Sequence, residues 1–126
     1  WRGWMARVDH KVKSKRSRGS AVIAKVDLEI RGKPKLVQAR LLIPKYDRHR
    51  SAWRCRLEID APFSVGQDVF GETGLQALAL ALKILASHLY GSPMYEQKRL
   101  GAFGEFGGYL GLPAPKEFLA KAPFPF

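Results

Sequence analysis

The hydrophobic period of this chain changes once, near residue 72, from two residues to between three and four. Before this point, three segments alternate apolar and polar side chains, as half-buried strands do. After it, from Thr73 to Tyr90, leucines recur at helical spacing. A helix packed on the sheet would bury both apolar faces. The pattern therefore predicts an α+β fold, with a three- to four-stranded antiparallel sheet and one long helix on its apolar face.

The three strands are expected at residues 21–31, 35–43 and 52–60, paired as an antiparallel meander. The turn at Gly32-Lys33-Pro34 separates the first two strands, and Pro44 ends the second. Residues 61–71 are rich in turn formers and are interpreted as a connection. Residues 98–112 are interpreted as a fourth strand or an irregular hairpin. The helix is expected to bury a leucine stripe of Leu75, Leu78, Leu82, Leu85 and Leu89.

The positive charge of the chain is confined to its first half. Residues 1–60 carry 17 Lys and Arg against 6 Asp and Glu, whereas residues 61–126 carry five of each. Five cations fall between Lys11 and Arg18, with one apolar residue among them, so residues 1–19 are expected to form a mobile basic arm. A single globular domain is then expected at 20–112, followed by a Pro- and Phe-containing tail at 113–126.

Charge segregated in this way favours anionic partners. The candidate polyanion site combines flexible cations of the arm with a fixed patch on the third strand and the loop before it. Its members are Lys11, Lys13, Lys15, Arg16, Arg18, Arg48, Arg50, Arg54 and Arg56. Such cations contact phosphates without reading sequence. The alternative is a solvated arm beside a sheet face laced with salt bridges.

Other candidate sites are weaker. Glu58 and Asp60 lie two apart on one strand face, close enough for acid–base work, but arginines beside them favour cross-strand ion pairs. The single cysteine, Cys55, alternates in phase with apolar residues and is expected to be buried and inert. His88 lies near the helix C-terminus, where the helix dipole favours its charged form. The histidines show no common arrangement with Cys55, so we expect no metal site.

The stretch from Arg99 to Phe106 partly matches the aromatic strand motif of RNA-recognition domains. Leu100 interrupts the motif, one aromatic is missing, and the glycines lack the Lys-Ser/Thr ending of a phosphate loop. A tight hairpin in which Phe103, Phe106 and Tyr109 cap the core is the simpler interpretation. Base stacking by these aromatics is the alternative.

The segment from Trp53 onward resembles a class of small uncharacterised bacterial domains. The shared elements are a strand meander, the turn Gly66-Gln67-Asp68, the helix start Gln76-Ala77-Leu78 and a late Leu-Gly-Leu-Pro at residues 110–113. The resemblance implies a sheet with a helix and brings no assigned chemistry.

We therefore expect a non-enzymatic binding module for a polyanion, with nucleic acid as the first candidate and no cofactor. The alternative is a protein-partner module of the immunity or antitoxin type that binds an acidic protein surface. The apolar segment 122–126 is a candidate interface for such a partner or for a homodimer. No stretch is long and apolar enough for a membrane span and no secretory signal is visible, so a cytoplasmic location is expected.

Overall fold

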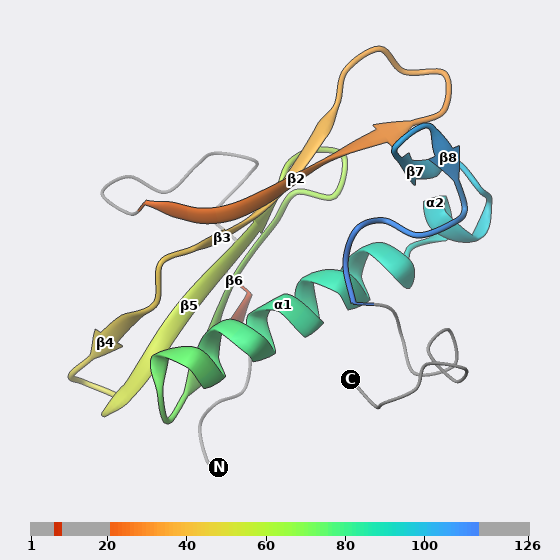
Figure 1. The fold of residues 1–126 in the computed structure, drawn as a ribbon. Helices are drawn as coiled ribbons and strands as arrows, with labels where there is room; N and C mark the ends of the chain where they lie inside the picture. The colour runs from red at the N-terminus through yellow and green to blue at the C-terminus, as the bar shows by residue number, and fades with distance from the viewer. Residues whose placement is uncertain (1–6, 9–20, 114–126) are drawn as a thin grey trace, which may run out of the picture.

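The computed structural model describes residues 7–8 and 21–113, and in this part of the chain eight strands form one antiparallel sheet (Figure 1). Seven strands follow each other in the order β1-β6-β5-β3-β2-β7-β8, and β4 pairs with β5. The strands are β1 (Arg7–Val8), β2 (Val22–Ile30), β3 (Val37–Leu42), β4 (Lys45–Asp47), β5 (Ala52–Ile59), β6 (Val65–Gly71), β7 (Leu100–Ala102) and β8 (Glu105–Phe106). Helix α1 (Gly74–Tyr90) crosses one face, and the short α2 (Pro93–Glu96) follows it.

The predicted three- to four-stranded sheet is wrong, because the structure is mostly sheet. The expected meander is present as β2, β3 and β5, but β6 extends it on one side and β7–β8 on the other. Strand β6 lies in the segment that we interpreted as a connection. It pairs with β5 from Trp53↔Gly71 to Ile59↔Val65, so long-range pairing overrides the turn preference of its glycines.

Helix α1 begins and ends at conventional caps. The Thr73 hydroxyl accepts a hydrogen bond from the Gln76 backbone N–H (3.0 Å), and the Gln76 side-chain oxygen accepts one from the Glu72 N–H (2.8 Å). At the other end, the Gly91 N–H donates to the Ser87 carbonyl (2.9 Å). These bonds satisfy backbone groups that a helix leaves unpaired at its ends.

The predicted leucine stripe of α1 is only partly correct. The buried residues are Ala77, Ala81, Leu85, Ala86, Leu89 and Tyr90, whereas Leu78 and Leu82 are half-buried. Leu75 is 77% exposed. Alanine and leucine occur all around this helix, so periodicity alone could not determine which face packs on the sheet.

The outer face of the sheet, which we define as the face away from α1, also contains buried residues. On β3 and β5, the side chains of Ala39, Leu57 and Ile59 belong to the core under the helix, and their neighbours Arg40 and Glu58 point the other way. Arg40 and Glu58 are nevertheless each only 1% exposed. Half-buried strands would leave this polar face in water, and at its centre that expectation is wrong.

Two parts of the predicted organisation lie outside the described residues. These are the expected mobile arm, apart from strand β1 within it, and the tail beyond Pro113. Strand β1 pairs with the edge of β6, with Arg7 opposite Asp68. Within the described residues, no helix is long and apolar enough to cross a membrane.

Candidate functional site

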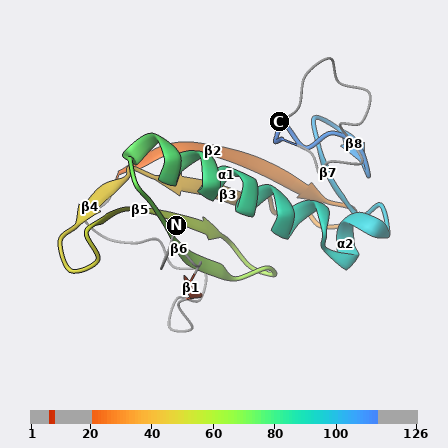
Figure 2. The same ribbon diagram turned by 90° about the horizontal axis from the view of Figure 1, so that it is seen from below.

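The hairpin of β4 and β5 gathers most of the fixed cations that we singled out. We name residues 45–54 the basic hairpin. It lies at one end of the sheet, away from α2, β7 and β8 in both views (Figures 1 and 2). Its register places Lys45 opposite Arg54 and Tyr46 opposite Trp53. Cross-strand neighbours share a face, so Lys45 and Arg54 are both on the outer face.

The turn of the basic hairpin is held by one carboxylate. Asp47 accepts a hydrogen bond from the Arg50 backbone N–H (3.2 Å), and its other oxygen lies 3.4 Å from the Arg50 guanidinium. Desolvation opposes ionisation of Asp47, but these contacts and the His49 backbone prevail and lower its pKa. The Arg50 guanidinium also lies over the Phe70 ring, 4.8 Å from its centroid. Arg50 is thus held in place by β4 and β6.

The other two arginines of the basic hairpin are less constrained. Arg48 is exposed in the turn, and Arg54 is half-buried on β5. Within residues 7–8 and 21–113, neither has an ion pair with an acidic side chain. The ten residues of the basic hairpin carry four cations, Lys45, Arg48, Arg50 and Arg54, against the single carboxylate of Asp47.

An aromatic pair lies on the opposite face of the same hairpin. The rings of Tyr46 and Trp53 meet edge to face, with centroids 5.8 Å apart. Trp53 is half-buried and packs where α1 begins, since a Cβ on Gly74 would lie 3.3 Å from its ring. Tyr46 is 52% exposed. Tyr46 and Lys45 are absent from the predicted site, because the sequence predicts a loop after Pro44. The alternation of Lys45, Tyr46 and Asp47 is the signal that indicates a strand there.

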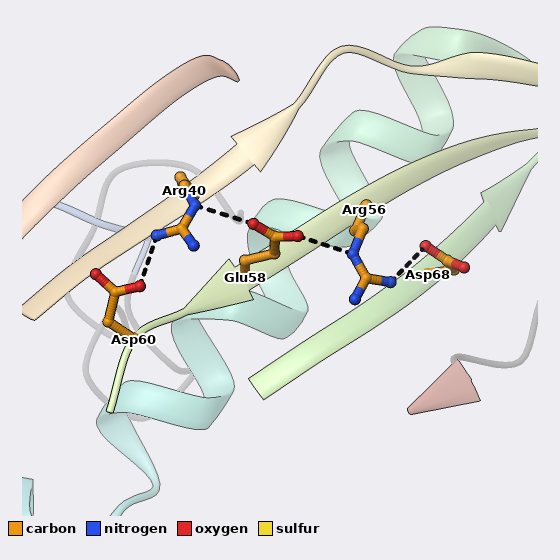
Figure 3. A network of polar contacts seen from close by, with 5 residues as sticks. All are labelled: Arg40, Arg56, Glu58, Asp60 and Asp68. Carbon is orange, nitrogen blue, oxygen red and sulfur yellow. Dashed lines mark hydrogen bonds and ion pairs between the residues drawn. The ribbon is translucent and has the colours of Figure 1, made fainter. Parts of the chain in front are cut away.

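Arg56, the ninth predicted site residue, belongs to a different group (Figure 3). Its Nε lies 2.9 Å from Glu58 Oε2, and its Nη1 lies 3.2 Å from Asp68 Oδ1. Desolvation opposes the charge, yet bonds to Glu58 and Asp68 raise the pKa of Arg56. Two carboxylates therefore compensate this guanidinium, and we remove Arg56 from the candidate patch.

The same network continues to β3. Arg40 Nε lies 3.0 Å from Glu58 Oε1, and Arg40 Nη1 lies 2.8 Å from Asp60 Oδ1. Three carboxylates and two guanidiniums thus alternate across β3, β5 and β6. The cross-strand ion pairs expected for Glu58 and Asp60 are confirmed. Their presence gives these carboxylates a structural role.

The remaining predicted cations are Lys11, Lys13, Lys15, Arg16 and Arg18, and all of them lie outside the described residues. The structure therefore brings together Arg48, Arg50 and Arg54 from the predicted set and adds Lys45.

Cys55 is buried, as expected. It is 0% exposed, its thiol donates to the Leu42 carbonyl (3.3 Å), and burial raises its pKa to about 12. A thiol with this pKa has almost no thiolate at neutral pH. Within the described part of the chain, no group of three or more His, Cys, Asp or Glu side chains could hold a metal ion.

His88 differs from our expectation. Its Nε2 lies 2.8 Å from the side-chain oxygen of buried Gln67. An amide oxygen can only accept a hydrogen bond, so the Nε2–H group of His88 is the donor. Desolvation lowers the pKa of His88, which outweighs the predicted stabilisation of its charged form by the helix dipole.

The aromatic segment 99–106 forms the hairpin β7–β8. Leu100 and Ala102 are buried in the core, and Phe106 lies under the Arg31 guanidinium at 4.5 Å. Phe103 is 76% exposed at the turn, and Tyr109 is 59% exposed. The prediction that Phe103 and Tyr109 cap the core is therefore wrong.

The fold defined by these contacts is an antiparallel sheet with one long helix and a projecting basic hairpin. A family model, described as "Domain of unknown function (DUF6968)", matches residues 24–114, and the chain belongs to this family. The predicted likeness to an uncharacterised domain is confirmed, while bacterial origin stays a prediction. Searches for similar curated proteins and for similar solved structures found no match.

Proposed function

We propose that this domain is a non-enzymatic module that binds a polyanionic partner, with nucleic acid as the first candidate. The basic hairpin is the folded part of the contact surface. The observation that carries the proposal is that residues 45–54 contain four cations and only one carboxylate. At the centre of the outer face, Arg40 and Arg56 are compensated by buried or half-buried carboxylates, whereas the basic hairpin carries net positive charge.

The hairpin offers two kinds of contact to a nucleic acid. Arg48 and Arg54 donate charge-assisted hydrogen bonds to phosphates, and Arg50 adds a guanidinium whose position is already fixed by Asp47 and Phe70. Tyr46 presents a half-exposed ring on which an unpaired base can stack. Phosphate contacts and stacking both tolerate any sequence, so we expect binding without base specificity.

The cations of residues 11–18 would add further phosphate contacts to those of the hairpin. The reduced, buried thiol of Cys55 is compatible with the cytoplasmic location that we propose.

The test is fluorescence anisotropy with a labelled single strand and a labelled duplex of unrelated sequences over a range of salt. The variant Arg48→Gln with Arg54→Gln removes two charges from the basic hairpin. The matched control, Lys33→Gln with Lys35→Gln, removes two charges at the other end of the sheet. We expect the hairpin variant to bind more weakly and its salt slope to fall by about 1.8 on duplex DNA, at about 0.9 per phosphate contact.

The control variant should retain the parent's affinity and slope. Equal losses in both variants would mean that total charge, and not the hairpin, governs binding. If the parent binds neither DNA nor RNA at low salt, nucleic acid is not the partner. An acidic protein surface, as bound by immunity or antitoxin proteins, would then become the leading candidate.

A further inference from the structure

A pocket of about 440 Å³ opens at the end of the sheet opposite to the basic hairpin. It lies between the β2–β3 turn, the residues that follow β5 and helix α2. Its floor is apolar: Ile30 and Val37 are core residues of β2 and β3, and Met94 of α2 packs against that core. Leu36 and Pro62 form part of its rim.

Three cations surround this apolar pocket, namely Lys33, Lys35 and Arg99. None of the described residues that line it is acidic, and within the described part of the chain none of the three has an ion pair. The backbone of Arg99 is held firmly, because its N–H donates to the Met94 carbonyl (2.9 Å) and its carbonyl accepts from the Arg31 N–H (2.8 Å). The exposed Arg99 side chain is therefore attached to a well-anchored backbone at the edge of the pocket.

We propose that this pocket binds a small organic anion that consists of an apolar body and one carboxylate. The volume lies in the range of small-molecule sites, which are mostly apolar and carry a few polar groups that orient the ligand. The apolar floor removes the ligand body from water, and the cationic rim compensates its charge. An uncharged ligand would gain no electrostatic attraction from the three cations, and a cationic ligand would be repelled by them. This site is separate from the surface proposed for nucleic acid.

Met94 makes the pocket directly observable. The chain contains two methionines, Met5 and Met94, so ¹³C-methyl labelling of methionine gives two NMR signals. Decanoate, kept below its micellar concentration, is the probe. We expect a saturable shift of the Met94 methyl signal. Decanol and decylammonium have the same apolar chain without the carboxylate, and we expect at least tenfold weaker binding of both.

Two variants separate charge from apolar contact. Lys35→Gln with Arg99→Gln should weaken decanoate at least tenfold and leave decanol unchanged. Leu36→Glu, at a rim position that is 51% exposed, should also weaken decanoate without unfolding the domain. Lys83→Gln, which alters an exposed lysine of α1, is the matched control and should bind decanoate as the parent does.

The proposal is overturned if the Met94 signal does not shift, or if decanol and decylammonium bind as tightly as decanoate. It is also overturned if the charge variants bind decanoate like the parent while circular dichroism shows them folded. Nucleic-acid binding by the same variants is measured separately, so failure of this site does not affect the proposal for the basic hairpin.

Discussion

At the scale of single residues, Arg40 shows how charge is accommodated inside this sheet. Its side chain is fully buried, and it bridges Glu58 on β5 and Asp60 just beyond it. Removing a buried charge from water is costly, and close carboxylates offset that cost only while the partners remain together. Replacing only one member of the Arg40–Glu58 pair should therefore destabilise the fold more than replacing both.

We predict that Arg40→Met lowers the free energy of unfolding by about 3–5 kcal/mol, because it leaves the buried charge of Glu58 poorly compensated. The double variant Arg40→Met with Glu58→Met should lose less than the single variant. Urea unfolding measures both. Lys25→Met, which removes an exposed ion pair to Asp27 on the same face, is the control and should change stability little. Additive losses in the double variant would contradict this interpretation.

His88 contributes to the pH dependence of the free energy of unfolding. Its pKa is lowered in the folded state by desolvation, so the unfolded chain binds more protons near its ordinary pKa of 6.5. Stability should therefore rise with pH through this region and fall as pH drops below about 6.5. We predict that His88→Gln, which can still donate to Gln67, flattens the stability profile between about pH 7.5 and 5.5, a range where histidine titrates and most carboxylates do not.

Thermal unfolding at each pH measures this effect. His49→Gln alters an exposed histidine of the basic hairpin and should keep the parent's pH dependence. A parent whose stability does not change across this range would show that His88 titrates alike in both states.

At the scale of the elements, the strands that alternate in sequence could be predicted and the others could not. Strands β2, β3 and β5 alternate apolar and polar residues in the sequence, and their apolar residues Leu28, Ala39 and Leu57 lie in the core. In β6, Gln67 is buried and Gly66 and Gly71 interrupt the pattern, so its strand character comes from pairing with β5. Arg48, Arg50 and Arg54 could be predicted from charge. The ion pair between Arg56 and Asp68 could not, because Asp68 lies on that unrecognised strand.

Close contact between α1 and β6 explains why residue 71, the last of that strand, is glycine. A Cβ at Gly71 would lie 2.6 Å from the Ala77 backbone nitrogen, and Ala77 is fully buried. Small residues thus set the distance between helix and sheet. We predict that Gly71→Ala lowers the free energy of unfolding by about 1–3 kcal/mol, because backbone must shift to admit the methyl group. Gly108→Ala, where a Cβ meets nothing within 4 Å, should be close to neutral in the same urea titration. Equal stability of both variants would mean that the helix shifts at no cost.

At the scale of the whole molecule, the net charge of +11 is distributed over distinct places. The outer-face network of Arg40 and Arg56 is compensated internally, whereas the basic hairpin and the pocket rim carry excess positive charge at opposite ends of the sheet. The cations of residues 11–18 add to this excess. A partner that binds by counterion release should respond to the number of cations it contacts and not to the sequence of its bases.

We therefore predict that replacing Lys11, Lys13, Lys15, Arg16 and Arg18 with Gln weakens binding to unrelated nucleic acids by similar factors and flattens the salt slope. Combining these changes with Arg48→Gln and Arg54→Gln should give free-energy losses that add, because the two groups contact different phosphates. Anisotropy titrations over a range of salt measure both quantities. A loss confined to one nucleic-acid sequence would instead indicate base readout by these cations, since phosphate contacts are common to every sequence.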